Sequence, residues 1–254
     1  MPLRELCAFA VIGLMVYGQD KPRLTFEVAS IKVAKERRGG IFAKPGGQTY
    51  IAEGAWVKEM ISLMYKIPER QITGGPAWME EQGFDIEAKA DHSYNLDDLH
   101  TMFQNMLADE FKLKFHKENR EGNVYSLTID KAGLKMKPNE SEEPFKVPIQ
   151  GVGPGKVAGI RVPMQYLCWW LSQVVQRDER PVVNNTGLTG NYDFTLAFLR
   201  DLPPGVDKDQ LPPELLELPS IFVAVKEQLG LKLEAQKGPV EFYVIDHVEK
   251  PAGN

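Results

Sequence analysis

The stretch PVVNNTGLTGNYDFTLAF (181–198) joins a short apolar run to a second run in which apolar and polar residues alternate. The stretch QITGGPAWMEEQGFDIEAKA (71–90) has the same order of features. The turns of the two stretches contain two glycines each, namely Gly74, Gly75, Gly187 and Gly190. Glycine adopts positive φ angles without steric cost, and a period of two is typical of a half-buried strand. Both stretches are therefore predicted to be strand–turn–strand units with structural glycines, rather than a ligand cradle.

Two further pairs of segments repeat along the chain in the same order. Residues 48–67 and 155–175 each have the pattern of a strand followed by a helix, while residues 96–131 and 219–250 each have that of an amphipathic helix followed by a hairpin. Three consecutive pairs in one order indicate an internal duplication.

The fold class predicted from this pattern is α+β, with two related β-α-β-β-α-β-β units, mainly antiparallel sheets and helices packed on them. The first unit is assigned to residues 19–138 and the second to residues 155–254, joined by a linker over residues 139–154 that is rich in Pro and Gly. Residues 200–219 are predicted to be a Pro-rich, irregular insertion. An additional strand near residues 24–36 is expected to complete a sheet edge and to have no counterpart in the second unit. If the units are true domains, residues 155–254 should fold alone.

Local signals place the helices. Apolar residues recur at helical spacing in two segments, at Val57, Met60, Ile61 and Met64 and again at Met164, Leu167, Cys168 and Leu171. Asn95 is expected to cap a helix beginning near Leu96, and Ser220 or Pro219 to open its counterpart. Gly230 lies where that last helix must end.

The N-terminal segment 1–18 has a short charged start and twelve uncharged residues before Gly18. This run is shorter than the roughly 20 residues that a helix needs to span a bilayer, and it fits the core of a secretory signal peptide. Cleavage would remove Cys7 and leave Cys168 as the one remaining thiol, expected to be a small buried hydrophobe. The protein is therefore predicted to be exported to the periplasm or the exterior, with no membrane span in its mature form; an anchor or a buried helix is the alternative.

Composition excludes some classes of function. The chain is 43% hydrophobic and 26% charged, which is ordinary for a globular protein, and its net charge of −5 argues against a nucleic-acid partner. The four histidines, His92, His100, His116 and His247, lack the spacing of a zinc site, and GVGPGK (151–156) lacks that of a phosphate loop. The sequence predicts no cofactor, no metal and no recognisable catalytic set.

Asp85 and Asp193 occupy equivalent positions in the two repeats. A carboxylate that recurs after the same turn is expected to solve the same local problem, such as accepting hydrogen bonds from nearby backbone amides. A binding role and a catalytic role, in which His92 would join the two carboxylates, are the alternatives.

Aromatic residues are the other candidates for binding. Trp169 and Trp170 are adjacent on a predicted helix, so their side chains diverge by about 100° and do not share one narrow apolar stripe. Trp78 lies beside a Gly-Pro turn, and Tyr192 follows the turn of the second repeat. Burial in a wide stripe or contact with a partner or a carbohydrate are both open for these side chains.

Several of these segments resemble a known family. FEVASIK, ITGGPAW, FDIEAKA, LADEFKLKFHKENRE, RPVVNNTGLTGNYDFTL and QLGLKLEAQKGPVEFYVIDHVEKP are similar to the signature segments of a soil-associated, acidobacterial family of secreted proteins of unknown function (domain of unknown function 3738 type). The resemblance covers the chain from Phe26 to Pro251 and implies no activity. More weakly, each half resembles the short N-terminal domain of secretins and TonB-dependent transducers, which implies a periplasmic module that docks other proteins.

These observations favour an exported, non-enzymatic interaction module whose partner is an envelope or secreted protein, bound at a sheet edge or in a groove between the halves. The alternative is a protein that binds an extracellular small molecule or oligosaccharide through Trp78, Trp169 or Trp170 in the cleft between halves. A hydrolase built around Asp85, Asp193 and His92 is the third hypothesis.

Overall fold

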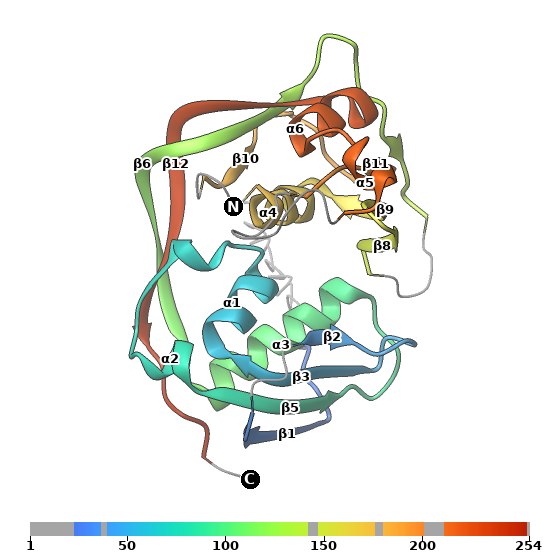
Figure 1. Ribbon diagram of the computed structural model, residues 1–254. Coiled ribbons are helices and arrows are strands. Elements are labelled where there is room, and N and C mark those ends of the chain that lie inside the picture. The colour runs from blue at the N-terminus through green and yellow to red at the C-terminus, as the bar shows by residue number, and fades with distance from the viewer. Residues whose placement is uncertain (1–22, 37–39, 142–146, 176–179, 201–210, 253–254) are drawn as a thin grey trace, which may run out of the picture.

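The computed structural model describes residues 23–36, 40–141, 147–175, 180–200 and 211–252, so the predicted signal peptide (1–18) lies outside the described residues. Across these ranges the protein has a mixed α+β fold with three four-stranded sheets (Figure 1). Antiparallel pairing predominates, as the sequence predicts. The internal duplication itself stays a prediction.

The first half is built on an antiparallel sheet. Its strands lie in the order β1 (Val28–Val33), β5 (Gly83–Lys89), β3 (Thr49–Trp56) and β2 (Ile41–Ala43). Helices α1 (Val57–Tyr65) and α3 (Leu96–Glu110) lie on the face of this sheet that is turned toward the second half (Figure 1). The additional N-terminal strand, β1, completes a sheet edge as expected.

The second half has a similar sheet. Its strands lie in the order β7 (Lys137–Pro138), β11 (Asn191–Ala197), β9 (Lys156–Pro163) and β8 (Ile149–Gly153). Two sequence predictions are wrong here. Strand β7 pairs with β11 at the sheet edge as β1 pairs with β5, so β1 does have a counterpart. Strand β8 occupies part of the predicted linker (139–154), because its backbone pairs with β9 despite its glycines.

The helices follow the local signals. The apolar residues predicted to share one face of α1 and of α4 (Met164–Val174) are buried. Asn95 caps α3 by accepting a hydrogen bond from Asp98 N, and Ser220 caps α6 (Ile221–Ala224). A π-helical turn, η3 (Val225–Leu229), continues α6 to Gly230, whose φ is 69°. Three short elements are not predicted: η1 (Glu69–Gln71), α2 (Trp78–Glu81) and, in the Pro-rich insertion, α5 (Pro213–Leu216).

Two long strands replace the predicted hairpins. Residues Lys114–Ile129 form one strand, β6, and residues Leu231–His247 form another, β12. The two pair with each other antiparallel along their whole length and pass side by side through both halves (Figure 1). The hairpin prediction is wrong because each segment continues as one strand through its middle, where Gly122 and Gly238 face each other.

The two glycine turns connect strands that belong to different sheets, so they are not hairpin turns. Their four glycines have φ angles between 70° and 84°, as structural turn glycines require. Yet β4 (Ile72–Gly74) pairs in parallel with β12, while β5 pairs with β1 and β3. In the second half β10 (Val182–Asn184) pairs in parallel with β6, while β11 stays in its own sheet. Each turn therefore transfers the chain from one sheet to another.

The described residues form two hydrophobic clusters, and each long strand contributes to both. Tyr243 and Ile245 of β12 are buried in the cluster of the first half. Tyr125 and Leu127 of β6 are buried in that of the second half. Full burial of one such side chain stabilises the fold by about 1.5–3 kcal/mol. Each core therefore depends on side chains that the ribbon supplies.

This arrangement predicts that neither half folds alone. A fragment of residues 155–254 lacks the whole of β6, which is the antiparallel partner of β12 and supplies Tyr125 and Leu127 to its core. We expect it to be insoluble or to lack cooperative thermal unfolding when it is followed by circular dichroism. Co-expression with residues 19–154 is the matched control and should restore a soluble complex. Cooperative unfolding of the 155–254 fragment by itself would contradict the shared architecture.

Candidate ligand-binding cleft

A cavity of 360 Å³ lies where the two halves meet. The end of α1 and the segment after it line one side, α4 and β10 line the other, and the middle of the β6–β12 ribbon closes it. We call this cavity the interhalf cleft and define it by lining residues that can contact a ligand: Tyr65, Lys66, Gln71, Gln165, Trp169 and Glu241. Its size falls within the range of roughly 300–1,000 Å³ that is typical of small-molecule sites.

Trp169 is the predicted aromatic residue that reaches the cleft. Its indole N–H donates to Ser62 Oγ of α1 at 3.5 Å, so the side chain links the halves. The ring of Tyr166 packs against it edge-on, with 5.4 Å between centroids. Trp170 points elsewhere, against Phe198 at 5.9 Å, and lines a second cavity of 380 Å³. The two neighbouring indoles diverge as their positions on a helix require.

The side-chain amide of Gln71 is buried, and in the described part of the chain only its nitrogen is hydrogen-bonded. The residue is 7% exposed, and its side-chain amide donates to the carbonyl oxygen of Glu241 at 2.6 Å. Its Oε1 atom has no hydrogen-bond partner among the described residues. A buried acceptor left in this state costs about 1–3 kcal/mol.

A buried chain of three polar side chains adjoins the cleft. Lys66 Nζ donates to the carbonyl oxygen of Leu63 and lies 2.7 Å from His100 Nδ1. On the other side of the ring, His100 Nε2 lies 2.9 Å from the Tyr50 hydroxyl. Burial lowers the pKa of Lys66 to about 7. Burial also lowers the pKa of His100, and the Lys66 charge lowers it further, so the imidazole is neutral at pH 7.

This chain can move protons, because every member is both close to the next and able to donate and accept. Burial raises the pKa of Tyr50, which therefore stays protonated. Sequence reasoning missed the chain, since its members come from β3, the end of α1 and α3. The one available signal is His100 itself, a titratable residue beside Leu99 on the apolar face of α3.

Asp85 and Asp193 make the backbone contact that their repeated position predicts. Asp85 Oδ1 accepts from Gly54 N, and Asp193 Oδ1 accepts from Arg161 N, each at 2.8 Å. Gly54 and Arg161 have φ angles of 60° and 51° and lie at the bulges of β3 and β9. Each carboxylate thus stabilises a left-handed residue in the neighbouring strand.

The proposed hydrolytic trio is not brought together. Asp85 lies on β5 and Asp193 on β11, and these two strands belong to different sheets. The ring of His92 packs on Tyr94, with 4.0 Å between centroids, and contacts Asp91 at 3.0 Å.

The two other aromatic candidates lie outside the cleft. Trp78 is half-buried on α2 and packs edge-on against Phe84, with 6.2 Å between centroids. Tyr192 is buried in the second core, and its hydroxyl donates to Thr189 O at 2.9 Å.

Cys168 is buried, and burial raises its pKa to about 12. A thiol with so high a pKa is a poor nucleophile at neutral pH. The residue is therefore the small hydrophobe that the sequence predicts.

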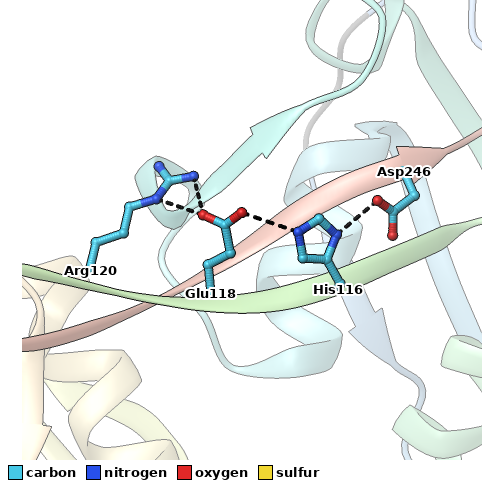
Figure 2. A network of polar contacts seen from close by, with 4 residues as sticks. All are labelled: His116, Glu118, Arg120 and Asp246. Carbon is cyan, nitrogen blue, oxygen red and sulfur yellow. Dashed lines mark hydrogen bonds and ion pairs between the residues drawn. The ribbon is translucent and has the colours of Figure 1, made fainter.

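A separate polar network lies on the exposed surface of the ribbon. Figure 2 shows the His116 ring between two carboxylates, with Nδ1 2.8 Å from Asp246 Oδ1 and Nε2 3.2 Å from Glu118 Oε1. Arg120 Nη2 donates to Glu118 Oε2 at 2.8 Å. The bonds to Asp246 and then Glu118 raise the pKa of His116, while those from Arg120 and then His116 lower the pKa of Glu118.

Within the described ranges, no group of three or more His, Cys, Asp or Glu side chains is arranged to hold a metal ion. No helix in the same ranges is both long and apolar enough to cross a membrane.

Comparison with known proteins identifies a family. The model of the family described as "Protein of unknown function (DUF3738)" matches residues 58–248, so the chain belongs to this family. No curated protein and no solved structure matches the chain.

The two bulge contacts can be tested by mutation. Asp85→Ala and Asp193→Ala each remove the acceptor of a backbone amide, and each should lower the free energy of unfolding in urea by about 1–3 kcal/mol. Asp85→Asn and Asp193→Asn keep an acceptor oxygen at the same place and should retain more of the stability. If the alanine variants unfold at the wild-type urea concentration, the contacts are not stabilising.

The surface network should make stability depend on pH. Because the folded pKa of His116 is raised, the stability that His116 contributes is present below its unfolded pKa of about 6.5 and is lost as pH rises through its folded pKa. The folded pKa of Glu118 is lowered, so the stability that Glu118 contributes is lost as pH falls through the folded pKa of Glu118. His116→Gln should therefore lower the urea midpoint most near about pH 5–6 and least above about pH 8. An equal loss at both pH values would contradict this assignment.

Proposed function

We propose that this member of the DUF3738 family is a non-enzymatic binding protein that holds a small hydroxylated ligand, of the sugar class, in the interhalf cleft. The observation that carries the proposal is the meeting of Trp169 with the amide side chains Gln71 and Gln165 in one cavity. Both halves contribute to this cavity, so a ligand bound there would contact each of them.

The lining supports a ligand with several hydroxyl groups. Amide side chains both donate and accept, as hydroxyl groups do, and Gln71, Asn119 and Gln165 all line the cleft. Trp169 and Tyr65 add flat apolar surfaces with polar tips. A few polar groups that fix orientation within a partly aromatic wall are typical of small-molecule sites.

Charge at the cleft favours a neutral ligand over an ionised one. The Glu241 carboxylate already pairs with Lys117 at 3.2 Å. Lys66 is close to half protonated at neutral pH, because burial lowers its pKa to about 7. Neither group presents a full, unpaired charge that would select an ionic partner.

The predicted signal peptide extends the proposal to location. Its apolar run supports export, and a periplasmic or extracellular protein would meet sugars released from cell walls or plant material. The internal duplication is part of the same proposal. Each half contains a sheet, a glycine turn that leads the chain from one sheet to another, and one of the two long strands of the ribbon.

Docking of an envelope or secreted protein is the second candidate, in line with the weak resemblance to the secretin and TonB module. Its supporting observation is the edge strand β1, where Val28 and Val33 are each 60% exposed. An exposed apolar edge strand can pair with an extended segment of another chain.

Tryptophan fluorescence tests the cleft directly. Titration of the mature protein with a panel of pentoses, their alditols and cell-wall disaccharides should give saturable quenching by at least one of them. Trp169→Phe should abolish the quenching signal, because the indole lies in the cleft. Trp170→Phe is the matched control, since that side chain packs against Phe198 and should leave the signal intact.

Gln165→Leu tests the exposed amide of the lining. We expect it to weaken binding by about tenfold, as the loss of one hydrogen bond to a ligand would. Saturable binding that Trp169→Phe and Gln165→Leu leave unchanged would move the site elsewhere. The absence of any saturable quenching would favour the docking candidate.

A further inference from the structure

We propose that the Lys66 amine is a nucleophile that captures an aldehyde or ketone group in the interhalf cleft as a reversible imine. The inference rests on the proposed function and names the reactive group of its ligand, such as the open-chain form of an aldose. It adds a covalent step to a site that otherwise binds through hydrogen bonds alone.

Lys66 is placed at the cleft by its backbone. The residue ends α1 in the left-handed region, with φ 55°, and its N–H bonds to Ser62 O. A residue other than glycine in this region costs of order 1 kcal/mol or more and persists where the surroundings fix it. The side chain is directed by three contacts: Leu63 O, His100 Nδ1 and the Tyr166 ring, whose centroid lies 5.5 Å from Nζ.

The partners of this amine differ from those of a structural lysine. Buried lysines are ordinarily paired with a carboxylate, yet among the described residues the hydrogen-bond partners of Nζ are a carbonyl oxygen and a neutral imidazole. Asp97 of α3 acts on Lys66 only as a more distant charge, and it is outweighed by burial. Trp169 adds a ring face at 5.8 Å. The ring faces favour the ammonium form, but burial outweighs them and lowers the pKa of the amine.

The free amine is the form that reacts. With a pKa of about 7, close to half of the Lys66 side chains are unprotonated at neutral pH. An ordinary lysine, with a pKa near 10.4, is unprotonated in fewer than about one molecule in a thousand at that pH. A desolvated lysine in an apolar pocket is the recognised way to activate this nucleophile.

The step balances without an oxidant or a metal. The nitrogen lone pair of Lys66 attacks the carbonyl carbon, a C–N bond forms, and the C=O π electrons move to oxygen. One proton passes from the nitrogen through His100 Nδ1 to the oxygen and gives the neutral carbinolamine; the second nitrogen proton follows the same route to the departing oxygen. The C–O bond breaks, water leaves and the C=N bond forms; hydrolysis reverses the sequence. The hydrogen bond between His100 Nε2 and Tyr50 holds the imidazole in place during both transfers.

Reductive trapping tests the proposal. The full mature protein is incubated with ribose and cyanoborohydride at pH 7, and the modified lysines are quantified by peptide mass spectrometry. We expect Lys66 to be labelled at least tenfold faster than the exposed Lys44, which is the internal reference. The Lys66 rate should level off above about pH 7, whereas the Lys44 rate should keep rising toward about pH 10. Labelling of Lys66 no faster than Lys44 would overturn the proposal.

Ribitol separates this inference from the proposed function, because it has the hydroxyl groups of ribose and no carbonyl. If ribitol quenches Trp169 fluorescence while ribose gives no adduct at Lys66, the cleft binds sugars and only the imine proposal fails. If neither compound quenches and no adduct forms, both proposals fail.

Stability measurements distinguish a reactive lysine from a structural one. Replacing a buried charge by an apolar side chain of similar length is often neutral or stabilising. Lys66→Met should therefore keep a cooperative thermal unfolding transition at or above the wild-type temperature and give no adduct at residue 66. A clearly lower transition temperature for Lys66→Met would show that the amine is retained for the fold and would overturn the proposal.

Discussion

The antiparallel pairing of β6 with β12 is the interaction on which the rest of the structure depends. It extends from Ile129 opposite Leu231 to Lys114 opposite His247. Each half adds one short parallel strand to the ribbon, and each core takes side chains from it. The two halves are consequently parts of one packing unit, even though each has its own outer sheet. Gly122 and Gly238 mark the point where the ribbon passes between them.

The interhalf cleft is a consequence of the same pairing. The middle of the ribbon supplies Asn119, Val240 and Glu241 to its wall, while α1 and α4 approach from opposite sides. Trp169 and Ser62 join those helices across the gap. A cleft with walls held in this way is largely preformed, which lowers the ordering cost of binding a small ligand.

Local sequence patterns predict the local structure well, and long-range pairing poorly. The helix faces and the caps at Asn95 and Ser220 follow from residues near each other in the chain. The hairpins do not, because REGN (120–123) and KGP (237–239) are compatible with a turn or with a continuous strand. The choice between them is made by a partner strand in the other half of the chain.

The same distinction between local patterns and long-range contacts applies to the residues of the candidate site. Trp169 could be singled out from the sequence because two adjacent indoles cannot share one helix face. Lys66, His100 and Tyr50 could not, since each is ordinary in its own segment. Their chemistry arises only where the end of α1, α3 and β3 meet in a place that excludes water and lowers the pKa of the amine.

Scanning calorimetry of residues 19–254 tests the central claim, that both halves depend on one shared ribbon. The account predicts a single transition whose calorimetric enthalpy equals its van't Hoff enthalpy, because neither core can persist once β6 and β12 separate. Two resolved transitions, or a calorimetric enthalpy well above the van't Hoff value, would show that the halves unfold independently and would contradict the account.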